Sequence, residues 1–145
     1  MASHRGGIVI LDYFGDLNWL AVLVAALAYF VLGAIWYSNP LFGRQYRAAL
    51  GVTGEAGTPD PMMFVVNLVG WFVAATVLGL IAKGIGASTF LDGVVLGLVA
   101  WVGFVVTNRV VAIYYEGSGW AIARVNGPYN LLGYVVMGVI LAVWQ

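Results

Sequence analysis

The stretch that decides the fold runs from Phe90 to Tyr115 and reads FLDGVVLGLVAWVGFVVTNRVVAIYY. It stays apolar until the Thr-Asn-Arg sequence at residues 107–109, and about 20 predominantly apolar residues in a helix cross the hydrocarbon core of a bilayer. Thr89 and Asp92 fit a capping box, with Asp in place of Glu, that begins a helix at this point. The stretch therefore predicts a membrane-spanning helix with polar groups toward one end.

The composition of the whole chain agrees with that reading. Its 145 residues are 63% hydrophobic and only 8% charged, with a mean hydropathy of +0.97. Soluble domains typically carry about 25% charged residues. Most of the surface therefore cannot face water, and the sequence predicts an all-α integral membrane protein.

Three further apolar runs complete the pattern. With 90–115, we expect spans at about 17–38, 61–83 and 120–145. Residues 17–145 then form one four-transmembrane-helix bundle, after an N-terminal lead-in at 1–16. Pro128 either begins the last span or produces a kink in it, and the sequence leaves both options open.

Local signals predict where the helices begin and end. Asp16 is a plausible N-cap for the first span, and Asp60-Pro61 is a strong start for the second. We expect the second span to end at Lys83, with Gly84 as the residue that follows the helix. Gly93 and Gly97, four residues apart, are the best candidates for close helix packing, and Gly70/Ala74 repeats the spacing.

The segment 41–50 predicts a short interfacial helix after the first span. Its aromatic residues fall on one helical face and Arg44 and Arg47 on another, a pattern typical of helices at a membrane surface. Trp19 and Trp36 are roughly 25 Å apart along the first span, close to the hydrocarbon thickness. We expect these four residues to be interfacial anchors that contact membrane lipids.

Several function classes are excluded by what the sequence lacks. There is no Cys, His4 is the only histidine and Lys83 the only lysine, so we expect no cofactor and no metal site. Without a nucleophile beside a base, or an acid deep in a span, we also expect no enzymatic activity. Six basic residues balance six acidic ones, which gives no basic face for nucleic acid.

One polar cluster stands out near the ends of the last two spans. It comprises Asn108, Arg109, Glu116, Arg124, Asn126 and Asn130. Glu116 follows Arg109 by seven residues on one helical face, so we expect it to pair with Arg109 or with Arg124. Asn126 and Asn130 share a face, where Asn108 and tyrosine hydroxyls could meet them. The cluster either supplies interhelical hydrogen bonds and anchoring, or it binds an anionic or polar solute or a lipid headgroup.

Trp71 and Trp101 are predicted at mid-span on neighbouring antiparallel helices. They either line an apolar pocket or simply pack in the core of the bundle, and indole side chains suit both roles.

The sequence FVLGAIWYSNPLFG at residues 30–43, preceded by Asn18-Trp19, resembles the opening of a bacterial membrane family known only as domain of unknown function 1761. The similarity continues through residues 89–93 and 101–104 to Glu116 and resumes at Asn126, so it covers most of the chain after residue 16. Pro128 departs from the family's pattern. The resemblance implies four membrane spans and a bacterial origin. It implies no activity, because none is assigned to the family.

Two functional hypotheses remain. The first is a transport or permeation protein that works as a homo-oligomer, because four short spans enclose little space alone. The second is a non-catalytic scaffold or accessory subunit that binds lipid or a membrane protein partner; a ligand or lipid sensor is a third. Arg44, Arg47, Arg109 and Arg124 lie toward one face and Arg5 and Lys83 toward the other. The positive-inside rule then predicts that both termini lie outside. With the bacterial origin that the resemblance implies, we expect the protein in the bacterial inner membrane.

Overall fold

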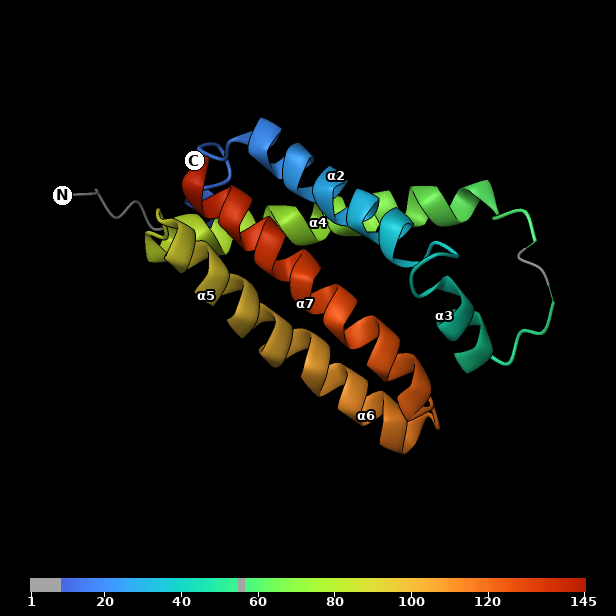
Figure 1. Ribbon diagram of the computed structural model, residues 1–145. Helices are drawn as coiled ribbons and strands as arrows, with labels where there is room; N and C mark the ends of the chain where they lie inside the picture. The colour runs from blue at the N-terminus through green and yellow to red at the C-terminus, as the bar shows by residue number, and fades with distance from the viewer. Residues whose placement is uncertain (1–8, 55–56) are drawn as a thin grey trace.

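The computed structural model describes residues 9–54 and 57–145, so residues 1–8 of the predicted lead-in lie outside the described residues. The helices are α1 (Val9–Asp12), α2 (Trp19–Trp36), α3 (Gly43–Ala49), α4 (Pro61–Ile85), α5 (Phe90–Ala100), α6 (Thr107–Tyr115) and α7 (Trp120–Val143), with a π-helical segment, η1 (Trp101–Val106), between α5 and α6. Together α5, η1 and α6 form one continuous rod (Figure 1).

Four of these elements are long and apolar enough to cross a membrane: α2, α4, the α5–η1–α6 rod and α7. They contain 18, 25, 26 and 24 residues respectively. The predicted fold class, a helical bundle with four candidate transmembrane helices, is confirmed. The chain has the architecture of a multi-pass membrane protein.

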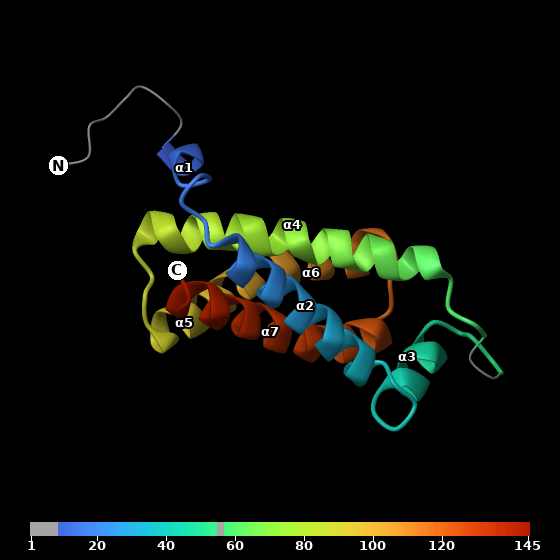
Figure 2. The same cartoon turned by 90° about the horizontal axis from the view of Figure 1, so that it is seen from above.

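The spans do not pack in chain order. α7 packs against α2, α4 and α5, and α2 also packs against α4, whereas α5 lies along α7 and not along the preceding α4. Figure 1 shows α4 and the α5–α6 rod starting together and then diverging, with α7 between them. From above, α2 crosses between α4 and α7 (Figure 2). The bundle is therefore closed at one end and splayed at the other.

The helix ends confirm two of the predicted signals and correct two others. The Asp60 side chain accepts from the Met62 amide at the start of α4, and Thr89 begins α5 with a capping box. Asn18, not Asp16, caps α2, because its Oδ1 accepts from the Ala21 amide at 3.1 Å. α4 ends at Ile85 and not at Lys83, and the residue that follows it is Gly86, with a left-handed φ of 70°, instead of Gly84.

Glycines let the closed end pack tightly. A Cβ added at Gly97 would lie 2.6 Å from Val135 Cα, and one at Gly93 would lie 2.7 Å from the Gly138 carbonyl oxygen. The backbones of α5 and α7 thus approach too closely for a side chain, as expected for membrane helices that associate through small residues. Gly70 behaves differently, because an added Cβ there meets no described atom within 4 Å.

Pro128 lies inside α7, which begins at Trp120. The proline therefore does not start the span. Proline has no amide hydrogen to donate to the backbone carbonyl one turn earlier in the helix. Near Pro128, the indole groups of two other spans donate to backbone carbonyls of α7. Trp36 Nε1 donates to Val125 O and Trp101 Nε1 donates to Gly127 O, each at 3.1 Å. These bonds fix the register of α7 against α2 and against the α5–η1–α6 rod.

Candidate functional site

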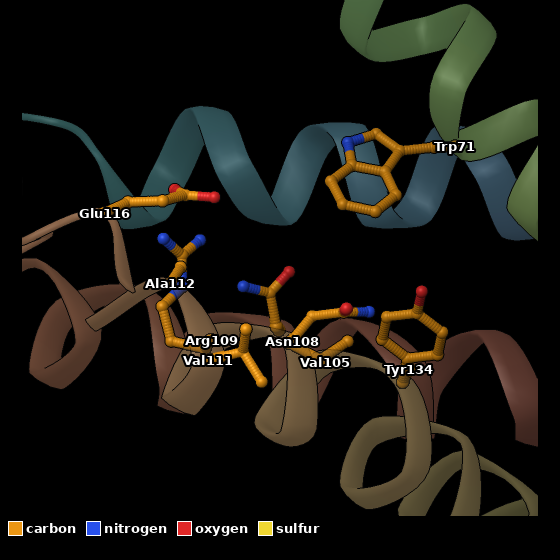
Figure 3. A pocket seen from close by; sticks show the side chains of 9 residues that line it. Trp71, Val105, Asn108, Arg109, Val111, Ala112, Glu116 and Tyr134 are labelled. Atoms are coloured by element: carbon orange, nitrogen blue, oxygen red, sulfur yellow. The ribbon is translucent and has the colours of Figure 1, made fainter. Parts of the chain in front are cut away.

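The splayed end of the bundle contains a cavity of about 410 Å³ between α4, α6 and α7. We call it the polar cavity; its polar and aromatic lining consists of Trp71, Asn108, Arg109, Glu116, Asn130 and Tyr134. Figure 3 shows Trp71 on one side, with Asn108, Arg109 and Tyr134 opposite it. Four of the six residues in the predicted polar cluster are therefore brought to one site.

The π-helical segment η1 positions the α6 residues of this cavity. A π-helix takes more residues per turn than an α-helix, so it rotates every residue that follows it, and such segments are frequent at functional sites. Two side chains bond to carbonyls within η1: Thr107 Oγ1 donates to Gly103 O, and Asn108 Nδ2 donates to Phe104 O at 2.6 Å. This bond uses one of the two amide hydrogens of Asn108 on its own helix and leaves the side-chain carbonyl oxygen available to the cavity.

Arg109 and Glu116 both line the polar cavity without forming an ion pair. Arg109 is half-buried and Glu116 is exposed. In the part of the chain that the structure describes, no ion pair with an N–O distance of 4.0 Å or less joins Glu116 to Arg109 or to Arg124. Neither predicted pair is formed, because Glu116 stands at the C-cap of α6, about two helical turns beyond Arg109. A guanidinium and a carboxylate are thus both available to a ligand.

A second cavity of about 640 Å³ lies between α2, α4 and α7. We call it the lateral groove. Its apolar wall includes Phe30, Ala34, Met63 and Phe64, and its polar residues are Tyr37, Tyr46, Asn67 and Asn126. Trp71 and Asn130 line both cavities, so the groove and the polar cavity adjoin at these two side chains.

Two tyrosines of α2 bond to the α7 asparagines. Tyr37 OH donates to Asn126 Oδ1 and Tyr29 OH donates to Asn130 Oδ1, each at 2.6 Å, while Asn130 Nδ2 donates to the Asn126 carbonyl at 2.8 Å. These bonds orient both asparagines.

Sequence reasoning did not identify Tyr29 and Tyr37 as the partners of the asparagines. The signal was present in their spacing. Eight residues are about 2.2 helical turns, so the two side chains lie roughly 80° apart within one broad face. Both hydroxyls bond to α7. The sequence lacked only the information that α2 and α7 are neighbours.

A reciprocal contact places α2 against α7 at this level. A Cβ at Gly133 would overlap the Tyr29 ring, and a Cβ at Gly33 would lie 2.8 Å from the Tyr129 hydroxyl. Each helix therefore presents a tyrosine to a glycine of the other, and in each helix the two residues are four positions apart. Trp71 stacks on Tyr29 with ring centroids 3.8 Å apart, which extends this aromatic layer to α4.

A family model described as a protein of unknown function (DUF1761) matches residues 20–142. The chain belongs to this family. The match covers all four candidate spans almost entirely and includes every residue named for the two cavities. Searches of curated proteins and of solved structures gave no match. Membership in the DUF1761 family confirms the resemblance seen in the sequence and adds no activity to it.

The remaining predicted site residues of this family member lie elsewhere. Arg124 is exposed and is not among the residues that line the polar cavity or the lateral groove. Trp101 lines a separate cavity of about 180 Å³ on the other side of Arg109, so it shares no cavity with Trp71. The prediction that the two tryptophans lie on neighbouring helices is wrong, because α7 packs between α4 and the α5–η1–α6 rod.

The predicted anchors have mixed surroundings. Trp19 is 39% exposed and packs edge-on against Phe14. Trp36 is half-buried, and its indole N–H bonds to α7 rather than facing outward. Arg44 and Arg47 lie on α3 at the splayed end, where Arg47 Nη2 donates to Asn39 Oδ1 at 2.7 Å. Their role as lipid anchors stays a prediction.

Proposed function

We propose that this DUF1761 protein is a permeation or transport protein that binds an anionic or polar solute in the polar cavity. The observation that carries the proposal is a half-buried arginine, without a carboxylate partner among the described residues, in a cavity of about 410 Å³. Arg109 is surrounded there by carboxamides from α6 and α7, and guanidinium groups bind carboxylates and phosphates well. An intramembrane charge is by default a functional candidate.

The bundle is tightly packed at the end away from the polar cavity. At this end Val22, Ala25 and Ala26 are fully buried, and the cavity near Gly79 measures only about 10 Å³. Passage of a solute therefore requires a second arrangement of the helices. We propose that this arrangement involves a homo-oligomer in the bacterial inner membrane, with both termini outside, and that the protein has no catalytic activity.

Flux through liposomes tests the permeation role, and the chain offers a matched control. Arg109→Ala removes the cavity guanidinium, whereas Arg124→Ala removes an exposed one outside the cavity. Hydrogen bonds to charged groups contribute about 1.5–3 kcal/mol. We expect Arg109→Ala to lower the flux of small anions at least roughly tenfold, since about 1.4 kcal/mol is a factor of ten. Arg124→Ala should leave flux unchanged.

Two results would contradict the permeation role: wild-type protein that carries no flux, or an equal loss of flux in both arginine variants. The second result would assign the effect to overall charge and not to the cavity. A solute that binds tightly without any flux would instead favour a sensor.

The alternative is a scaffold or accessory subunit, and one observation favours it. The first half of α4 has exposed apolar residues on all sides, among them Met62, Val65 and Val66 at 60%, 55% and 63% exposure. Tyr115 at the end of α6 is 88% exposed. Such surfaces suit lipid or a partner helix. Co-purification of a stoichiometric membrane protein partner would support this role.

A further inference from the structure

The polar cavity carries both signs of charge. Arg109 and Glu116 line it together, and no ion pair joins them within the described part of the chain. Glu116 follows Arg109 by two helical turns, about 10 Å along the axis. A purely anionic ligand could pair with Arg109 but would leave the Glu116 carboxylate without a positively charged partner. A ligand with a negative and a positive group would satisfy both side chains.

The charged site continues into an apolar one. Trp71 and Asn130 line both the polar cavity and the lateral groove. Met63 and Phe64 on the groove wall are 59% and 47% exposed, so the groove opens at the surface between α2 and α4. Both helices are candidate membrane spans, and this surface therefore faces the hydrocarbon of the bilayer.

We propose that the two cavities together bind a zwitterionic amphiphile, a lipid with a phosphate and an ammonium in its headgroup. The phosphate lies at Arg109, the ammonium lies toward Glu116, and a hydrocarbon chain occupies the lateral groove (Figure 3 shows the charged residues). Volumes of about 410 and 640 Å³ fall in the usual range of ligand sites, roughly 300–1,000 Å³. The inference rests on the proposed function, because it names the substrate class of the same site.

Binding to the purified protein in detergent tests this inference with three probes. Lysophosphatidylethanolamine carries phosphate, ammonium and one chain; lysophosphatidylglycerol lacks the ammonium; glycerophosphoethanolamine lacks the chain. We expect the first probe to bind at least tenfold more tightly than either of the others. Equal binding of the first two would overturn the role of the ammonium. Equal binding of the first and third would assign the site to a free zwitterion and overturn the role of the groove.

Two variants locate the binding. Glu116→Gln keeps the size of an exposed side chain and should abolish the preference for lysophosphatidylethanolamine over lysophosphatidylglycerol. Ala34→Phe narrows the groove at an exposed position and should weaken both lysolipids, with no effect on glycerophosphoethanolamine. Arg124→Gln serves as the control and should change none of the three affinities. A preference that survives Glu116→Gln would overturn the inference.

The outcomes separate this inference from the permeation role. Anion flux that depends on Arg109, without any preference between the lysolipids, would support the permeation role and reject the proposed amphiphile site. A lysolipid preference that depends on Glu116, without any flux, would retain the amphiphile site and reject permeation.

Discussion

The two ends of the bundle differ in the residues that fill them. At the closed end, Ala25, Ala26, Ala82 and Gly97 bring the helices into close contact. At the splayed end, tyrosines, tryptophans and asparagines stand between the helices, and two adjoining cavities remain. Both ends belong to the same four helices. The difference in side-chain size therefore accounts for where the bundle is closed and where it is open.

The comparison also separates two kinds of stabilisation. In lipid, helices gain little hydrophobic energy from associating, so close van der Waals packing and interhelical hydrogen bonds hold them together. The closed end relies on packing of backbone against backbone. The splayed end relies on hydrogen bonds such as Tyr29 to Asn130, and on aromatic contacts. Substitutions should consequently cost more at the closed end than at the splayed end.

The largest effect is expected for Gly97→Leu at the closed end. A Cβ at Gly97 would already lie 2.6 Å from Val135 Cα, and backbone atoms cannot move aside as a flexible side chain can. We expect a loss of about 3 kcal/mol or more in the free energy of unfolding, or no folded protein. Thermal unfolding in detergent, followed by circular dichroism, measures it.

Gly70→Leu is the matched control, on a part of α4 where an added Cβ meets no described atom within 4 Å. We expect no loss of stability there, and a small gain from the better helix propensity of leucine. Equal losses for both variants would contradict the claim that the two ends pack differently.

The closed end was more predictable from the sequence than the splayed end. The apolar run of α5, its Thr89–Asp92 capping box and the Gly93/Gly97 spacing are local signals, and the structure bears all three out. Such signals can be read from the sequence because the hydrophobic length, the cap and the glycine spacing are each contained within one helix. Even so, α7 as the partner of this glycine pair was not predicted.

The splayed end depends on which helices are neighbours and how they are rotated. The polar residues Asn108, Arg109 and Asn130 were identified because charges and carboxamides are rare in apolar spans. Their hydrogen-bond partners were not, because Tyr29 lies about 100 residues away from Asn130 in the chain. The π-helical segment before Thr107 had no visible signal, yet it sets the rotation of α6. The Arg109–Glu116 pair was expected from helical spacing and is not formed.

A smaller effect is expected for Gly133→Ala, where α2 meets α7. The added methyl overlaps the Tyr29 ring, but that ring belongs to a side chain that can shift. We expect a loss of about 1–3 kcal/mol in the free energy of unfolding, typical of an overpacked core. The loss should shrink when Tyr29→Leu makes room, which a double-mutant cycle detects.

Gly127→Ala is the control for Gly133→Ala on the same helix. An added Cβ at Gly127 meets no described atom within 4 Å, so the stability should stay within about 1 kcal/mol of wild type. If Tyr29→Leu gave no relief to Gly133→Ala, the tyrosine-on-glycine contact would not be the source of the loss.

The smallest effect is expected for the hydrogen bond from Tyr37 to Asn126, which closes the outer end of the lateral groove. Interhelical hydrogen bonds in membranes contribute on average about 0.6 kcal/mol and at most about 1.7 kcal/mol, because the unfolded chain in the membrane also finds partners. A cycle of Tyr37→Phe and Asn126→Ala should give a coupling in this range. Tyr114→Phe, at a residue that is 75% exposed, should change nothing. A coupling as large as the Gly97→Leu loss would mean that polar bonds hold the splayed end as firmly as backbone packing holds the closed one.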